Sequence, residues 1–169
     1  SSDLPQESIQ GTQWWTSYQP VSYKLDSKLG TEAEFKNMVQ QCSAAGVGII
    51  ADVVLNQTTG ADVAAGDQKG VAGSEYNGST GSYPGFATKQ YPDGITAADF
   101  HSCTKNISDY TNQKEVQECR LSSMWDFNSE SEKVQDIQSD YLASLWNAGV
   151  RGFRMDAVKH IHTDSMKAI

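Results

Sequence analysis

Helical periodicity marks two segments of the chain. Apolar residues that recur at the spacing of one helical face follow a capping box formed by Thr31 and Glu34, which predicts a helix that ends before Gly46. A second helix is predicted from Ser131 to just before Gly149. Its apolar face consists of Val134, Ile137, Tyr141, Leu142 and Leu145.

Each predicted helix leads into a short apolar run. Residues 47–55, VGIIADVVL, and residues 150–158, VRGFRMDAV, are rich in β-branched or bulky apolar side chains. Such runs are typical of strands covered on both faces of a parallel sheet. The helix–strand alternation predicts an α/β fold. Residues 56–128 are rich in Gly, Ser, Thr, Asp and Asn, and we interpret them as an irregular inserted lobe, because so long a loop is improbable in a compact domain.

Charge and length exclude some classes of function. The 169 residues carry a net charge of −8 and a pI near 4.7, which argues against a nucleic-acid partner. No apolar run approaches the roughly 18 residues of a membrane helix, so no membrane partner is expected. The first residues show no basic or apolar signal-peptide region.

Cysteines and glycosylation sequons point to a secreted, extracellular protein. Cys103 and Cys119 enclose a short polar loop and are expected to form a disulfide, with two reduced thiols as the alternative. Cys42 then has a partner outside this chain or is a small buried residue. The three sequons begin at Asn56, Asn77 and Asn106.

The second strand carries two opposite charges inside its apolar run. Alternation along a strand places Arg154, Asp156 and Val158 on one face, and Phe153, Met155 and Ala157 on the other. A neighbouring arginine lowers the pKa of a buried carboxyl group and keeps it ionised. An ionised carboxylate at a strand end is suited to nucleophilic attack. The alternative is a plain buried salt bridge.

Polar groups also gather at the end of the first strand and in an aromatic cluster. Asn56, in the stretch DVVLNQ, offers an amide oxygen suited to Ca²⁺, although a turn residue is the commoner reading of such an asparagine. Trp14, Trp15 and Tyr18 precede Gln19 in a segment without strand or helix pattern. They are either core residues or a flat platform for a ligand such as a sugar ring.

Together these segments resemble the α-amylases of glycoside hydrolase family 13, over nearly the whole chain. DVVLN, at 52–56, is similar to the first conserved motif of the family, and GFRMDAVKH, at 152–160, to the second. The resemblance implies a partial (β/α)8 TIM barrel, with strands three and four. Residues 1–55 and 129–169 would belong to the barrel, and residues 56–128 would form domain B. The surroundings of WWTSYQP, CRL and WDF are most similar to animal-type and related microbial members.

The resemblance also implies roles for single residues. Asp156 matches the nucleophile of a retaining mechanism, and Arg154 matches an arginine that orients it and that binds chloride in animal-type relatives. Asp52 matches a structural aspartate, and Cys42 a half-cystine with an upstream partner. The implied ligands of Ca²⁺ are the side chains of Asn56 and Asp126 and the carbonyls of Gln117 and His160. The implied sugar contacts are Trp14, Trp15, Tyr18, Gln19, Gln57, Lys159 and His160.

Two departures from the family pattern limit this expectation. The first motif normally ends in Asn-His, whereas Gln57 stands here and cannot become cationic, so altered or weakened catalysis is expected. The family's acid/base glutamate follows strand five and has no match, because Glu130 and Glu132 are expected at the start of a helix. The chain is therefore expected to be an inactive fragment of an α-amylase acting on starch, glycogen and malto-oligosaccharides, with the remainder of the barrel in other polypeptide. The alternatives are a carbohydrate-binding pseudoenzyme, a bare calcium-binding lobe, or another family 13 enzyme such as an α-glucosidase.

Overall fold

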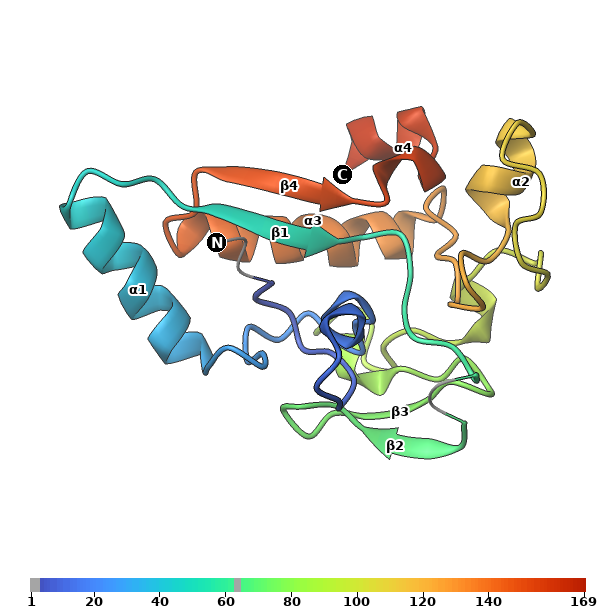
Figure 1. Ribbon diagram of the computed structural model, residues 1–169, viewed down its shortest axis with the longest axis horizontal. Coiled ribbons are helices and arrows are strands. Elements are labelled where there is room, and N and C mark those ends of the chain that lie inside the picture. Colours follow the sequence, from blue (N-terminus) through green and yellow to red (C-terminus); the bar gives the residue numbers. More distant parts are fainter. Residues whose placement is uncertain (1–3, 63–64) are drawn as a thin grey trace.

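A two-stranded parallel sheet forms the centre of one half of the protein. The structure is a computed structural model that describes residues 4–62 and 65–169. In it, β1 (Ile50–Val54) pairs with β4 (Gly152–Asp156) along their whole length. Helix α1 (Glu32–Ala44) leads into β1, and α3 (Glu132–Asn147), which runs along the sheet, leads into β4 (Figure 1). The predicted helix–strand order and parallel pairing are confirmed.

Both helices end where the sequence predicts. The side chain of Thr31 accepts a hydrogen bond from the backbone N–H of Glu34, and the Glu34 side chain accepts one in return from Thr31, which completes the capping box. Helix α1 ends at Ala44, before Gly46, which has a φ of +77°. Helix α3 ends at Asn147, before Gly149, which has a φ of +108°. In each case the glycine permits the left-handed turn toward the following strand.

The strands are shorter and less covered than predicted. Ala157 adopts a left-handed conformation with a φ of +50°, so the strand ends at Asp156. Val158 begins the short helix η4 (Val158–His160) and does not share the strand face of Arg154, as alternation had predicted. Ile50 is 60% exposed, and the residues of β4 are half-buried or exposed. The prediction of two fully covered strands is thus wrong for β4, which has no second strand beside it in the described part of the chain.

Residues 56–128 are mostly irregular, as predicted. They include a hairpin, two single-turn helices and one short α-helix, namely β2 (Asp67–Lys69), β3 (Glu75–Asn77), η2 (Pro84–Phe86), η3 (Ala97–Asp99) and α2 (Gln113–Glu118). The predicted disulfide between Cys103 and Cys119 is present. Cys42 is half-buried against Met38 and has no disulfide partner among the described residues.

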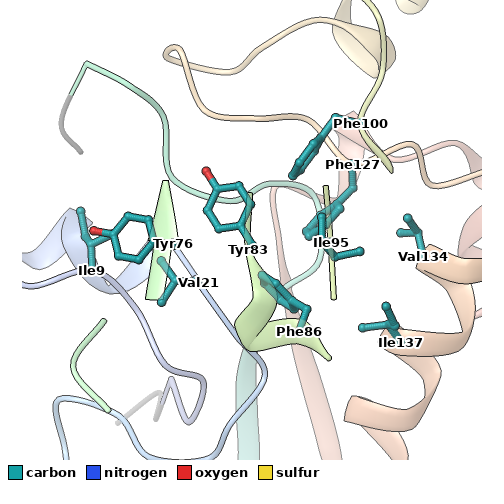
Figure 2. Packing of buried hydrophobic residues seen from close by; sticks show 10 residues of the cluster. All are labelled: Ile9, Val21, Tyr76, Tyr83, Phe86, Ile95, Phe100, Phe127, Val134 and Ile137. Atoms are coloured by element: carbon teal, nitrogen blue, oxygen red, sulfur yellow. The ribbon is translucent and has the colours of Figure 1, made fainter. Parts of the chain in front are cut away.

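Two apolar clusters hold these parts together. An aromatic cluster around Tyr83 joins the lobe to the N-terminal segment and to Val134 and Ile137 of α3 (Figure 2). A second cluster lies between the sheet and the helices. Tyr23 links the two, since its ring stacks on Tyr141 at 4.3 Å and packs edge-on against Phe86 at 4.8 Å. The lobe therefore shares its core with the sheet-bearing half through α3 and Tyr23.

The remaining elements lie at the ends of this framework. The single-turn helix η1 (Trp14–Tyr18) carries the N-terminal aromatic residues, and α4 (Thr163–Ala168) follows η4. Within the described residues, no helix has the length and apolar character needed to cross a bilayer.

Candidate active site

A buried carboxylate on β1 fixes the arginine of β4. The strand register places Asp52 directly opposite Arg154. Nη1 of Arg154 lies 2.8 Å and 2.9 Å from the two carboxylate oxygens of Asp52, which is only 1% exposed. The hydroxyl of Tyr18 donates to the same carboxylate at 2.8 Å. Because an unpaired buried carboxylate is costly, these contacts lock Arg154 and Tyr18 in place.

Asp156 is the second carboxylate that contacts Arg154. Its Oδ1 lies 2.9 Å from the same Nη1 atom, so the predicted pair is present. Burial raises the pKa of Asp156, the charge of Arg154 lowers it, and the nearby charge of Asp52 raises it again, with a raised pKa as the net result. Arg154 thus lowers this pKa as expected, but the net shift is upward, because burial outweighs the arginine and the charge of Asp52 adds to the effect of burial.

An open cleft of about 600 Å³ lies in front of this pair. It brings together the predicted residues from η1, from the end of β1 and from β4. Sequence reasoning did not find four further lining residues, because they come from distant irregular segments without periodicity: Asp62, Leu121, Ser122 and Met124. The predicted residues in the lining are Trp14, Trp15, Tyr18, Gln19, Gln57, Arg154 and Asp156.

The aromatic residues form an exposed wall of the cleft. Trp14 is 77% exposed and packs edge-on against Tyr18 at 5.9 Å. Neither it nor Trp15 belongs to either apolar core cluster. The interpretation as core residues therefore fails for these two tryptophans, and their exposed faces are free to stack on a ligand with flat apolar surfaces.

Gln57 and Gln19 are held in the inner part of the cleft. The amide of Gln57 donates to the backbone carbonyl of Tyr18 at 3.2 Å, and its buried Oε1 has no hydrogen-bond donor among the described residues. The amide oxygen of Gln19 accepts a hydrogen bond from Thr59 at 2.5 Å. The Gln57 side chain also lowers the pKa of Asp156, so it lies close to that carboxylate.

Asn56 and Asp126 form a buried polar pair at one side of the lobe. Nδ2 of Asn56 donates to Oδ1 of Asp126 at 3.1 Å, and both residues are almost fully buried. Burial raises the pKa of Asp126 to about 6, although a hydrogen bond from His101 opposes the shift. The structure thus brings together the two side chains predicted to bind Ca²⁺.

The other residues predicted for metal or sugar contacts lie at the junction of α2 and η4. Nδ1 of His160 lies 2.8 Å from the carbonyl of Val116, and Nε2 of Gln117 donates to the carbonyl of Ile161 at 3.2 Å. The ammonium group of Lys159 lies 5.0 Å from the ring centre of Tyr110. No hydrogen bond within the described residues joins this junction to Asn56 or Asp126, and Lys159 and His160 are outside the cleft lining.

A group of three side chains was not predicted from the sequence. His101, Glu130 and His162 place their nitrogen and carboxylate atoms within 4.8 Å of one another. Glu130 is expected from the sequence at the start of a helix, but α3 begins at Glu132 and its N-cap is Ser131, so Glu130 lies in the preceding turn. No sequence spacing signals this group, because its members are 29 and 32 positions apart.

These features define the class of protein: an α/β segment whose strand-end carboxylate faces a cleft with an aromatic wall. Within this class the chain belongs to the α-amylase family, since the family described as "Alpha amylase, catalytic domain" matches residues 14–168. An α-amylase from Pecten maximus is 39% identical over 156 residues, which are 92% of this chain and 30% of that protein. An α-amylase from Dermatophagoides pteronyssinus is 43% identical over 162 residues, again 92% of this chain and 30% of that protein.

Solved structures show the same relationship. The crystal structure of α-amylase I from Eisenia fetida matches with a TM-score of 0.88 and 36% identity, over 97% of this chain and 33% of that one. A mutant of the same enzyme has been crystallised in a complex with maltohexaose. The present chain therefore spans about a third of the length of these relatives and corresponds to part of their catalytic domain.

Substitution of Arg154 by glutamine tests the ion pair behind the cleft. The change leaves the buried carboxylate of Asp52 with the Tyr18 hydroxyl as its remaining side-chain partner among the described residues. We expect the free energy of unfolding to fall by about 1–3 kcal/mol, less than for a fully buried pair because Arg154 is half exposed. Denaturant unfolding of the complete protein at neutral pH measures this change in the free energy of unfolding.

Arg151→Gln is the matched control, because Arg151 is exposed and has no carboxylate partner among the described residues. Adding Asp52→Asn to Arg154→Gln should restore part of the lost stability, since it removes the uncompensated charge. Equal unfolding free energies for the Arg154 and Arg151 variants would contradict this account of the pair.

Proposed function

We propose that this chain is part of a secreted, calcium-dependent α-amylase that hydrolyses internal α-1,4-glucosidic bonds of starch, glycogen and malto-oligosaccharides. The observation that carries the proposal is the position of Asp156. Its carboxylate lies at the end of β4, inside the aromatic-walled cleft, and is held by an arginine that a buried aspartate fixes in turn. Membership of the family and the maltohexaose complex of an Eisenia fetida relative support the same substrate class.

In the proposed reaction, Asp156 attacks the anomeric carbon while the glycosidic C–O bond breaks and the departing oxygen takes a proton from a second carboxyl group. Water then hydrolyses the glycosyl–enzyme intermediate with retention of configuration and returns a proton to that second group. Arg154 orients the attacking carboxylate. The raised pKa of Asp156 makes its ionised form more basic and moves its protonation to higher pH, so activity should decline on the acid side as this group is protonated. The second carboxyl group that such a mechanism needs is proposed to come from polypeptide outside these 169 residues.

The cleft residues fit a role in sugar binding. Trp14, Trp15 and Tyr18 offer flat apolar surface, and the amides of Gln19 and Gln57 offer polar edges. Gln57 replaces the histidine of the family motif, and it provides no cation for transition-state charge. We therefore expect catalysis at this position to be weaker than in relatives with histidine.

Lys159 and His160 do not line the cleft, so the structure supports sugar contact less directly for them than for the cleft residues. Lys159 is exposed beyond the end of β4 and is free to reach a substrate that extends past Asp156. His160 is buried, and its ring is engaged by the carbonyl of Val116. We therefore propose that His160 acts through its backbone carbonyl, as a ligand of Ca²⁺, and not through its ring.

A calcium ion fits the environment of Asn56 and Asp126. A buried carboxylate with a raised pKa is stabilised by a cation, and hard oxygen ligands are those that Ca²⁺ prefers. A half-turn of the Asn56 amide would present its oxygen in place of Nδ2. The carbonyls of Gln117 and His160 are proposed as further ligands. We also propose that residues 56–128 form domain B and that residues 1–55 and 129–169 belong to the barrel. The ion would then join domain B to the barrel.

Chloride fits Arg154 less well. Its Nη1 atom already faces Asp52 and Asp156 at 2.8–2.9 Å, so an anion there would compete with two carboxylates. We propose no chloride at this position.

A carbohydrate-binding protein without catalysis is the second candidate, and the replacement of the family histidine by Gln57 favours it. Binding of malto-oligosaccharides without hydrolysis by the complete protein would establish that alternative. The products released from maltohexaose would separate an endo-acting α-amylase from an α-glucosidase.

Substitution of Asp156 by asparagine tests the proposed nucleophile. In the complete protein we expect kcat for starch to fall by at least about a thousandfold, because an amide cannot form the covalent intermediate. Reducing-sugar release measures the rate, and calorimetry with maltohexaose checks that binding persists. Asp140→Asn, on the exposed side of α3, is the control. Hydrolysis by Asp156→Asn at the rate of the control would rule out this role.

Substitution of Asp126 by alanine tests the calcium site. Loss of a charged oxygen ligand should weaken Ca²⁺ binding to the complete protein by at least about tenfold in titration calorimetry. Asp140→Ala removes an exposed carboxylate and should leave the affinity unchanged. If both variants bind Ca²⁺ equally well, Asp126 is not a ligand.

A further inference from the structure

A compact donor cluster lies beside the proposed calcium site but is distinct from it. His101 follows η3, Glu130 lies in the turn before α3, and His162 is the N-cap residue of α4. Nε2 of His101 lies 3.0 Å from Oε2 of Glu130, and Nε2 of His162 lies 3.1 Å from Oε1 of the same carboxylate. Three segments that are distant in sequence thus converge on one carboxyl group.

The environment of His101 matches that of a metal-bound imidazole. Its Nδ1 lies 2.6 Å from Oδ2 of Asp126, and the side chain is only 10% exposed. A carboxylate beside Nδ1 fixes the ring orientation and holds a proton on Nδ1, so that Nε2 can coordinate a metal ion once its own proton is lost, an arrangement common around metal-bound histidines. Asp126 is thus an orienting partner of this cluster, and its other oxygen, Oδ1, faces Asn56.

The second histidine provides an independent sign of a missing partner. Nε2 of His162 is inaccessible to solvent and makes no hydrogen bond of acceptable geometry within the described residues, despite its distance of 3.1 Å to Glu130. A buried polar atom without a partner is costly. The His162 side chain as a whole is 29% exposed and that of Glu130 47% exposed, so an ion can reach the cluster from the side of the Glu130 carboxylate.

We infer that His101, Glu130 and His162 form a binding site for a divalent transition-metal ion of the zinc type. Two imidazole nitrogens and one carboxylate oxygen suit Zn²⁺, whereas Ca²⁺ prefers a set of oxygen ligands. The ion would take the place of the proton on Nε2 of His101 and leave one coordination position for water. It would tie the start of α4 to the lobe segment that carries His101, so bound metal should also stabilise the protein against heat.

Metal titration of the complete protein in saturating Ca²⁺ tests this site. We expect one equivalent of Zn²⁺ to bind in calorimetry and to raise the melting temperature. Co²⁺ as a spectroscopic probe should give the visible absorption of a site with nitrogen ligands. Both His162→Gln and Glu130→Gln should weaken Zn²⁺ binding by more than about tenfold.

Glu132→Gln is the matched control, because it removes an exposed carboxylate two residues from Glu130 and should leave Zn²⁺ binding unchanged. Unaltered Ca²⁺ affinity and circular dichroism in each variant would show that the fold is intact. The inference is overturned if the unmodified protein takes up no Zn²⁺ and shows no Co²⁺ absorption. It is equally overturned if His162→Gln and Glu130→Gln bind Zn²⁺ as tightly as Glu132→Gln. None of these results depends on whether the protein hydrolyses starch.

Discussion

The contact between Asp52 and Arg154 is the constraint on which the cleft depends. Parallel pairing of β1 with β4 sets these residues opposite each other, and burial of Asp52 obliges the arginine to stay there. The same carboxylate accepts a hydrogen bond from the Tyr18 hydroxyl. This contact anchors η1, which carries the exposed tryptophans. One buried charge thus positions both the floor of the cleft, at Asp156, and its aromatic wall.

Sharing of one guanidinium also sets the electrostatics of the cleft. Arg154 holds Asp156 at 2.9 Å, but it neutralises Asp52 at the same time, so burial prevails and the pKa of Asp156 rises. A carboxylate that is oriented yet incompletely neutralised retains basicity and nucleophilic character. Beside the lobe, Asp126 is likewise a buried carboxylate between two partners, Asn56 and His101. The cleft and the proposed calcium site therefore have a common feature, a buried carboxylate whose polar contacts are shared among several side chains.

Local signals predicted the elements of the fold, while contacts between distant segments escaped prediction. The capping box at Thr31, the terminal glycines and the spacing of Cys103 and Cys119 act over a few residues, and the structure confirms each expectation. The end of β4 depends on the left-handed backbone of Ala157, which periodicity does not signal. The cleft residues of the lobe and the cluster around Glu130 arise from tertiary packing between segments with no common pattern. The motif residues of the cleft were predicted because their stretches resemble family motifs, whereas strand alternation alone left a plain salt bridge between Arg154 and Asp156 as the alternative.

Trapping the covalent intermediate tests the role of Asp156 most directly. The complete protein would be incubated with a fluorinated α-glucosyl fluoride, which forms the glycosyl–enzyme and slows its hydrolysis, then digested and analysed by mass spectrometry. We expect one glycosyl group attached to Asp156, in the peptide that contains this residue. Attachment to a different carboxylate, or steady release of fluoride without a labelled peptide, would contradict the claim that the Asp52–Arg154 pair positions Asp156 as the nucleophile.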